Sequence, residues 1–306
     1  MSTIRKKPVP ALKISHLTKL YDEKHGIKDI DLTVNQGEIF GFLGPNGAGK
    51  STTINTILDL LRPDSGSIEL LGLDHQKDAK KVHKYIGYLS GDMETDPTLT
   101  GAQYLSFVSH LHKNVDKKTI TSLVKRLKAD TSVKIKNLSR GNKQKIGLIA
   151  ALMHDPDILI LDEPTSGLDP LIQTEFNTIL SERKSNGKTT FMSSHILSEI
   201  QETCDRIGFI RDGKLVHVGS LQTLLKNTPR KIEARLKNSR FAKQLTQLNG
   251  VANLQQIDGM VTFTFSGDIN RLIHVFASQT IDSLTISEPD LEELFMGYYR
   301  EENQRV

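Results

Sequence analysis

The decisive stretch of this sequence reads Gly44-Pro45-Asn46-Gly47-Ala48-Gly49-Lys50-Ser51, which fits the pattern G-x-x-x-x-G-K-[ST] at every defined position. The apolar run 39–43 before it is typical of a buried strand, and the apolar residues of 52–61 recur at helical spacing. Glycines let the backbone curl, so that several N–H groups and the positive end of the helix face one phosphate chain. A glycine-rich turn with a chance lysine would leave the flanking elements unexplained. The stretch therefore predicts a phosphate-binding loop.

The polar groups of this loop are suited to a nucleoside triphosphate. The Lys50 side chain can reach the β- and γ-phosphates, and the Ser51 hydroxyl is an oxygen ligand for Mg²⁺. This pattern is known as the Walker A motif. We expect the nucleotide to be bound by Gly44, Pro45, Asn46, Gly47, Ala48, Gly49, Lys50, Ser51 and Thr52.

Further candidate residues follow two other predicted strands. The apolar run 158–161 ends in Asp162 and Glu163, and the strand 188–192 ends in Ser193-Ser194-His195. Ligands of open α/β sheets bind beyond the carboxyl ends of the strands, where an aspartate can hold Mg²⁺ and a glutamate can polarise the attacking water. Taken alone, these residues are ordinary polar strand ends. Beside a Walker A loop, they predict a metal site at Ser51 and Asp162 and catalytic roles for Glu163, His195 and Lys50.

Composition limits the class of protein. At 306 residues the chain has room for one large domain and a smaller one. Its 40 basic and 36 acidic residues give a formal net charge of +4, which is too mild to predict nucleic-acid binding. The single cysteine, Cys204, excludes a disulfide framework and favours a reducing compartment. No apolar run approaches the roughly 20 residues that span a bilayer, so we expect a soluble chain that reaches a membrane through a partner.

The middle of the chain predicts a helical subdomain at about 93–145. Ser139 is a natural N-cap for a helix that begins at residue 140, and that helix N-terminus is a second possible phosphate-binding end. Taken alone, it is a capped helix and no more. The stretch 142–145 fails the guanine-reading pattern Asn-Lys-x-Asp because its last residue is Lys145. We expect strands before this subdomain at 12–17, 27–34, 67–71 and 82–89.

A change of composition near Asn227-Thr228-Pro229 predicts a domain boundary, with an ATP-binding domain at 11–226 and an accessory α+β domain at 227–306. The predicted order of strands and helices in the second domain is βαββαβ, as in ferredoxin-like folds, followed by a helix from about 289. This domain carries no catalytic constellation. We expect it to regulate, dimerise or dock.

The Walker A and strand-end motifs together resemble those of the ATP-binding subunits of ABC transporters, and the resemblance extends over residues 11–226. Asp162 matches the aspartate of the Walker B motif, Glu163 the catalytic glutamate after it, and His195 the switch histidine. The resemblance implies an α/β P-loop NTPase domain of the ABC type that binds ATP and Mg²⁺.

Three further stretches are similar to motifs of the same family. Leu138-Ser139-Arg140-Gly141-Asn142 resembles the signature Leu-Ser-Gly-Gly-Gln, and it keeps Ser139 and Gly141, which would contact the γ-phosphate. Asp169 lies in a stretch like the D-loop, and Tyr21 is similar to the aromatic residue that stacks on adenine. On this resemblance, Ser139, Gly141, Asp169 and Tyr21 join the nucleotide-binding residues.

The chain departs from the family pattern at the Q-loop, where Gly91 followed by Asp92 replaces the usual glutamine. A glycine offers no side-chain oxygen to Mg²⁺. Asp92 can hold a water of the hydrated ion, or it is a solvated turn residue. The Ser90-Gly91-Asp92 form, the Arg-Gly-Asn signature and the C-terminal domain resemble the separately encoded ATPases of bacterial multidrug and antibiotic exporters.

The resemblance implies a head-to-tail dimer, most simply a homodimer, in which each ATP lies between Walker A of one subunit and the signature helix of the other. ATP hydrolysis would power a separate polytopic membrane permease that exports drugs, antibiotics or peptides, with this subunit on the cytoplasmic face of the cell membrane. The alternative is a soluble ABC-type ATPase that acts on nucleic acid or ribosomes. The chain lacks the long coiled coil and the second ATPase domain of such proteins. No nucleic-acid partner is expected.

Overall fold

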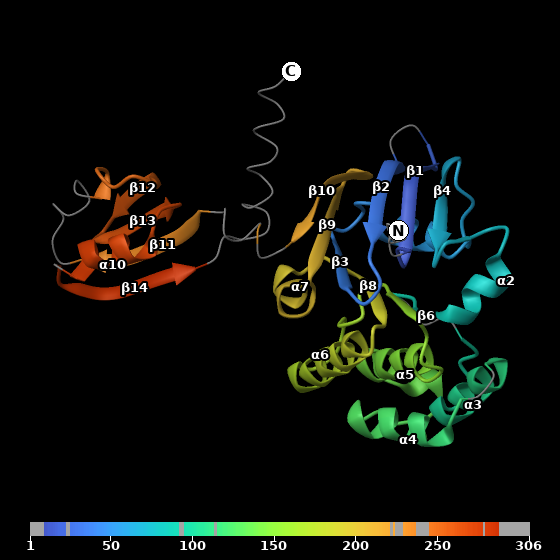
Figure 1. The fold of residues 1–306 in the computed structure, drawn as a ribbon. Helices are drawn as coiled ribbons and strands as arrows, with labels where there is room; N and C mark the ends of the chain where they lie inside the picture. Colours follow the sequence, from blue (N-terminus) through green and yellow to red (C-terminus); the bar gives the residue numbers. More distant parts are fainter. Residues whose placement is uncertain are drawn as a thin grey trace, which may run out of the picture. The chain divides into compact units, whose positions relative to one another are not determined.

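The computed structural model describes residues 9–22, 25–91, 95–112, 115–220, 223, 229–236, 245–277 and 279–287. The chain divides into two compact units, residues 1–221 and 222–306, which we describe separately (Figure 1). The domain boundary that we expected between residues 226 and 227 cannot be placed on the structure, because residues 224–228 lie outside its described part.

The first unit is built on a six-stranded sheet with the order β10-β9-β3-β8-β7-β6. Its strands are β3 (Ile39–Leu43), β6 (Ile86–Leu89), β7 (Ile158–Leu161), β8 (Thr189–Ser194), β9 (Arg206–Arg211) and β10 (Lys214–Ser220). All pairs are parallel except β9 with β10. Every residue of β3, β7 and β8 is buried, as expected for central parallel strands that are covered on both faces.

A second sheet of this unit is antiparallel, with the order β2-β1-β4-β5. It contains β1 (Leu12–Leu20), β2 (Gly26–Val34), β4 (Ser65–Leu70) and β5 (Leu73–Asp74). Residues of β1, β2 and β4 share one apolar core with β3, β7, β8 and with α1 (Lys50–Ile57). Helix α1 is therefore fixed between the sheets, and the glycine loop before it stands at the carboxyl end of β3.

The helical subdomain contains α3 (Gly101–Leu111), α4 (Lys117–Arg126) and α5 (Arg140–Leu152), which gather on the side of the unit away from β1, β2 and β4 (Figure 1). Thr100 and Gln103 form a capping box at α3, and Asp116 caps α4. Helices α6 (Pro170–Ser185) and α7 (Leu197–Thr203) follow the strands that carry the candidate carboxylates and histidine. The predicted subdomain at about 93–145 is thus helical, although α5 continues beyond it.

Two predictions about this unit were wrong in detail, and one helix was missed. Residues 82–85 are helical and not a strand, because α2 (Ala79–Val82) and a 3₁₀ turn (His83–Tyr85) come before β6, and the buried Val82 packs from a helix. Helix α1 ends at Ile57 because Asp59 adopts a positive φ of 59° and the N–H of Leu60 turns back to the Asn55 carbonyl. Helix α7 was not predicted.

The second unit has a four-stranded antiparallel sheet with the order β12-β13-β11-β14. Its elements are β11 (Arg230–Leu236), β12 (Val251–Ile257), β13 (Met260–Phe265), α10 (Ile269–Ala277) and β14 (Ile281–Ser287). Phe263 and Phe265 of β13 pack with Leu272 and Phe276 of α10 in a separate apolar core. These strands and α10 confirm the predicted elements. The first helix of the predicted βαββαβ order lies mostly outside the described residues, and so does the helix expected from about 289.

Candidate functional site

A pocket of about 440 Å³ opens over the glycine loop. Gly47 and Gly49 have φ values of 79° and 106°, and a Cβ on Gly49 would lie 2.7 Å from the side chain of Ile27. The loop can therefore curl this tightly only with glycine there. The pocket is lined by Tyr21, His25, Gly26, Asn46, Gly47, Gly49, Lys50, Ser51, Thr52, Glu163, Asp212 and Gly213.

Lys50 is the cation at the base of this pocket. Only 5% of the residue is exposed, and its Nζ donates to the carbonyls of Gly44 at 2.8 Å and Pro45 at 3.2 Å. Burial lowers the pKa of Lys50, whereas the nearby carboxylates of Glu163 and Asp162 act to raise it. A buried ammonium at a helix N-terminus, within a loop that only glycine can form, is a donor set that fits a phosphate chain.

The two strand-end carboxylates lie near this lysine, and Glu163 contacts it. Glu163 Oε1 lies 3.6 Å from Lys50 Nζ and 3.1 Å from Nδ1 of His195. Asp162 is buried, and its Oδ1 accepts a hydrogen bond of 2.5 Å from the Ser193 hydroxyl at the end of β8. Lys50, Glu163 and His195 are therefore close neighbours, and Asp162 stands beside them. The group can bind a phosphate, hold a cation and orient a water.

Gly91 lies beside Asp162. A Cβ built on Gly91 would lie 3.7 Å from Oδ2 of Asp162, which is an ordinary contact distance. The segment after β6 therefore passes next to Asp162, where the Q-loop resemblance predicts a sensing residue. Asp92, which we considered as the replacement, lies outside the described residues.

The signature stretch forms the N-terminal cap of α5, and its residues do not line this pocket. Ser139 Oγ accepts from the Asn142 N–H at 3.2 Å, and the Asn142 amide exchanges two hydrogen bonds with the backbone of Asp130. A Cβ on Gly141 would lie 2.3 Å from the Gly167 carbonyl, so the start of α5 packs directly on the D-loop stretch. Neither Ser139 nor Gly141 is among the residues that line the pocket.

Tyr21 and Asp169 are placed differently. Tyr21 lines the pocket and is 59% exposed, so its ring is free to stack on a planar group at the pocket mouth. Asp169 instead caps α6: its carboxylate accepts from the Ile172 N–H at 3.1 Å and lies 3.8 Å from Lys145 Nζ. Asp169 is therefore occupied within its own chain.

Sequence reasoning missed the contribution of the Asp212-Gly213 hairpin turn to the pocket. The Gly213 N–H donates to the Ala48 carbonyl at 3.1 Å, and the Gly213 carbonyl accepts from Lys28 at 2.8 Å. The turn thus supports the phosphate loop from the side. The dipeptide predicted a turn correctly, but no sequence signal gave its partner, because that contact joins residues far apart in the chain.

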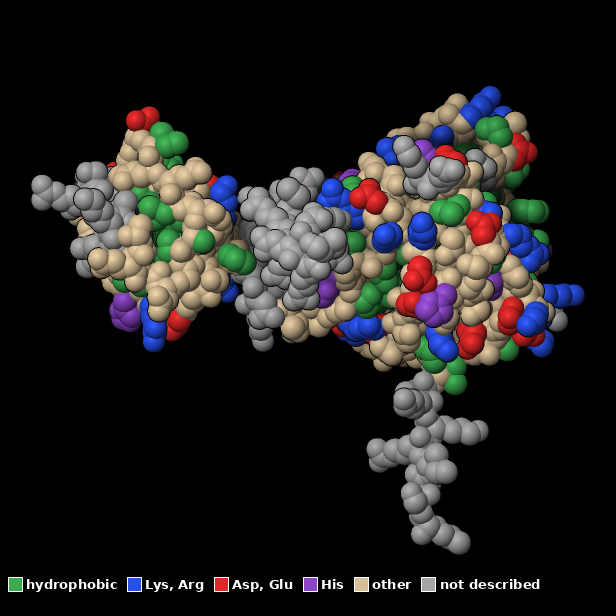
Figure 2. Space-filling model, turned by 90° about the horizontal axis from the view of Figure 1, so that it is seen from above, with side chains coloured by type: hydrophobic (Ala, Val, Ile, Leu, Met, Phe, Trp, Pro, Cys, Tyr) green, Lys and Arg blue, Asp and Glu red, His purple; other side chains and the backbone are tan. Residues whose placement is uncertain are grey.

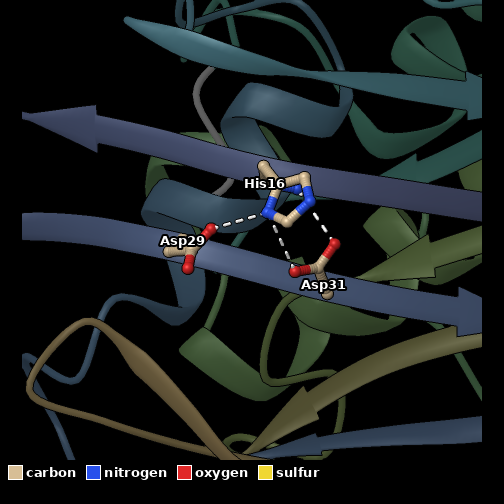
Figure 3. A group of neighbouring side chains, drawn as sticks. All are labelled: His16, Asp29 and Asp31. Atoms are coloured by element: carbon tan, nitrogen blue, oxygen red, sulfur yellow. Dashed lines mark hydrogen bonds and ion pairs between the residues drawn. The ribbon is translucent and has the colours of Figure 1, made fainter.

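A separate cluster of His16, Asp29 and Asp31 lies on the exposed face of β1 and β2 (Figure 3). The His16 Nδ1 lies 2.9 Å from Asp29 Oδ1 and 3.3 Å from Asp31 Oδ2. The hydrogen bond to Asp29, and the charge of Asp31 next, raise the pKa of His16. His16 and the two carboxylates contact one another on an exposed face and are not among the residues that line the pocket, so we assign them no part in the nucleotide site.

A strand, a glycine loop and a helix that present a buried lysine to an Asp–Glu pair define a P-loop nucleoside triphosphatase. The model of the family described as "ABC transporter" matches residues 27–166. The chain is 34% identical over 294 residues to the "Bacitracin transport ATP-binding protein BcrA" of Bacillus licheniformis, a match that covers 93% of this chain and 96% of that one. The chain therefore belongs to the ABC transporter family, among its ATP-binding proteins, and it is an ATPase.

Other relatives agree with this family. The chain is 37% identical over 214 residues to the "Probable multidrug ABC transporter ATP-binding protein YbhF" of Escherichia coli K12, covering 68% of this chain and 37% of that one. A solved structure described as the ATP binding subunit of an ABC transporter has a TM-score of 0.65 at 26% identity, covering 70% of this chain and 91% of that one. A dimeric bacterial ABC transporter cassette shares the fold, with a TM-score of 0.62 at 23% identity over 69% of this chain and 98% of that one. The predicted ABC-type P-loop fold is thereby confirmed.

Proposed function

We propose that this chain is the nucleotide-binding subunit that powers a separate membrane permease, which exports antibiotics, other drugs or peptides. The observation that carries the proposal is the contact of Glu163 with both Lys50 and His195 in the nucleotide pocket. The two quoted relatives, named for bacitracin transport and multidrug transport, support the exporter class. The proposal is tested by isolating the chain with its membrane partner and measuring ATP hydrolysis by the complex.

The proposed roles of the pocket residues follow from their chemistry. Lys50 and the N–H groups of residues 44–52 would bind the phosphates, while Tyr21 would stack on adenine. Ser51 and Asp162 would hold Mg²⁺, whose positive charge helps to neutralise the phosphate oxygens. Glu163 would orient the attacking water, and His195 would stabilise charge on the γ-phosphate. The short contacts among Lys50, Glu163 and His195 support these assignments.

We further propose that two copies of the chain form a head-to-tail homodimer. Ser139 stands at the N-terminus of α5, which is a suitable end for a phosphate, yet it does not line the pocket of its own chain. In the proposed dimer, Ser139 and Gly141 of each subunit would contact the ATP that is bound in the pocket of the other subunit. Asp169 would lie at the same dimer contact.

The membrane partner would dock in a groove of about 300 Å³ between the end of α1, β6, α3 and α5. Its lining is largely apolar, and Leu60 on its wall is 63% exposed. Tyr88 of β6 lines the groove, and Gly91 a short way along the chain lies beside Asp162. A partner seated there would be linked to the metal-binding carboxylate through this short segment.

No helix among the described residues is long and apolar enough to cross a membrane. We propose a peripheral subunit on the cytoplasmic face of the cell membrane, attached through the permease. The relatives named as ATP-binding proteins of transport systems support this proposal. The alternative action on nucleic acid has little support, because Lys and Arg side chains are interspersed with Asp and Glu over the visible face of the larger unit (Figure 2).

For the second unit we propose a ferredoxin-like domain. Its strand order places β11 between β13 and β14, antiparallel to both, as two split βαβ units require. Its core is separate from that of the first unit. These features support an accessory domain at 227–306 beside an ATP-binding domain at 11–226.

A chain that ends at residue 226 should fold and bind ATP as the full chain does. All the candidate nucleotide-binding residues lie in residues 21–195, and the pocket they form is complete by Gly213. Binding of a fluorescent ATP analogue and thermal melting would be compared between the truncated and the full chain. A soluble, folded truncation that fails to bind ATP would contradict the independence of the ATP-binding domain. If the truncation aggregates, co-expression with the membrane partner separates an exposed interface from misfolding.

A further inference from the structure

Glu163 has an unusual backbone. Its φ is +48°, in the left-handed region that a residue with a side chain adopts only at a cost. Such a conformation persists only where the surroundings hold it. The carboxylate of Glu163 meets Lys50 and His195 from this backbone, so whatever holds the backbone also aims the carboxylate.

The backbone of Glu163 is held from two different elements. On one side, its N–H donates to the Ser193 hydroxyl of β8 at 3.0 Å. On the other side, its carbonyl accepts from Nε2 of Gln144 at 3.1 Å, and the same amide donates to the Pro164 carbonyl at 3.0 Å. The Ser166 N–H also reaches the Glu163 carbonyl, but it comes from the same turn and moves with it.

Gln144 is buried, with 5% of its surface exposed, and it lies in α5 one helical turn and a little more beyond Ser139. Its amide has two backbone carbonyls as acceptors in a place that water reaches poorly. A hydrogen bond between buried groups is stronger and more directional than one in water. The amide therefore fixes the distance between α5 and the turn that carries Glu163.

We propose that Gln144 is a positioning residue for ATP hydrolysis: it holds the backbone of Glu163 so that the carboxylate faces Lys50 and His195, and it ties this carboxylate to the helix that begins at Ser139. The inference rests on the proposed catalytic role of Glu163. This role differs from the one proposed for Ser139 at the N-terminus of α5. Gln144 contacts Glu163 and Pro164 of its own chain and is not among the residues that line the pocket.

Gln144→Met tests the proposal, because methionine matches glutamine in length and cannot donate a hydrogen bond. We expect kcat for ATP to fall about tenfold while KM changes less than about twofold, since the phosphate loop is untouched. The matched control is Gln36→Met. Gln36 also donates to a backbone carbonyl, that of Val9 at 2.9 Å, but it precedes β3 at the end of the strand away from the glycine loop. The control should leave both constants unchanged.

A double-mutant cycle shows whether Gln144 acts through Glu163. Single-turnover hydrolysis of radiolabelled ATP would be measured for Gln144→Met, Glu163→Gln and the double variant. We expect no further loss from Gln144→Met once Glu163 is replaced. An equal fold-loss in both backgrounds, or an unchanged kcat in the single variant, would overturn the proposal. If Gln144→Met does not fold, Gln144→Leu replaces it in the same cycle, because leucine also cannot donate and places no charge between the two carbonyls. Failure of the catalytic assignment itself would appear separately, as normal turnover in Glu163→Gln alone.

Discussion

Glu163→Gln should bind ATP normally and lose almost all turnover, by about 100-fold or more, because the amide cannot act as a base toward the attacking water. Glutamine keeps the size of the side chain, and the backbone contacts of Glu163 with Ser193 and Gln144 do not involve the carboxylate. ATP should therefore be retained without hydrolysis. If the chain dimerises around ATP as proposed, the variant accumulates as an ATP-bound dimer.

Light scattering after size exclusion, with and without ATP, measures the trapped dimer, and phosphate release measures turnover. Glu182→Gln is the matched control, since Glu182 forms an exposed ion pair with Arg126 on α4 and lies outside the pocket. Such surface pairs contribute little, so this control should keep the rate of the unmodified chain. Turnover in Glu163→Gln equal to that of the control would remove Glu163 from the chemistry.

The sequence predicted the types of residue at this site better than the tertiary contacts that hold them in place. Local patterns were sufficient for the glycine loop, for the apolar strand that ends in Asp162 and Glu163, and for the Ser139 cap of α5, because each depends on neighbours in the chain. The strand-end rule also placed His195 at the carboxyl end of its strand, but its contact with Glu163 follows from the structure, in which β7 and β8 are adjacent parallel strands.

What the sequence could not predict depends on tertiary contacts. Nothing near Gln144 in the chain indicates that its amide meets the carbonyls of Glu163 and Pro164. The positive φ of Glu163 is imposed by those contacts and by Ser193, not by local preference. Residues 82–85 were mistaken for strand because they run directly into the apolar strand 86–89, although the spacing of Val82, Tyr85 and Ile86 also fits a helical turn.

A mixture of Lys50→Ala and Ser139→Ala chains should recover ATPase activity that neither variant has alone. In the proposed dimer, each ATP lies between Lys50 of one subunit and Ser139 of the other, so the mixed dimer has one site with both defects and one intact site. The position of Lys50 at the base of the pocket, with Ser139 outside it, supports this arrangement. ATP hydrolysis by mixed dimers, isolated through two different affinity tags, gives the measurement.

The reciprocal mixture provides the control. Dimers of an unmodified chain with a chain that carries both substitutions have one defect in each site under the proposed arrangement, so they should be inactive. If Ser139 instead served the ATP of its own chain, the pattern would reverse, and only this second mixture would hydrolyse ATP. Activity in the second mixture and none in the first would therefore contradict the head-to-tail dimer.

The central claim is that ATP hydrolysis by this chain powers a separate membrane permease. The most direct measurement seeks the proposed permease in the neighbouring reading frame and co-expresses it with the tagged chain. The complex is purified in detergent, and ATP hydrolysis is followed in reconstituted vesicles. We expect the membrane protein to co-purify with the chain and the ATPase activity of the complex to be lost in Glu163→Gln. Purification of the chain with ribosomes or nucleic acid, and with no membrane protein, would contradict the account.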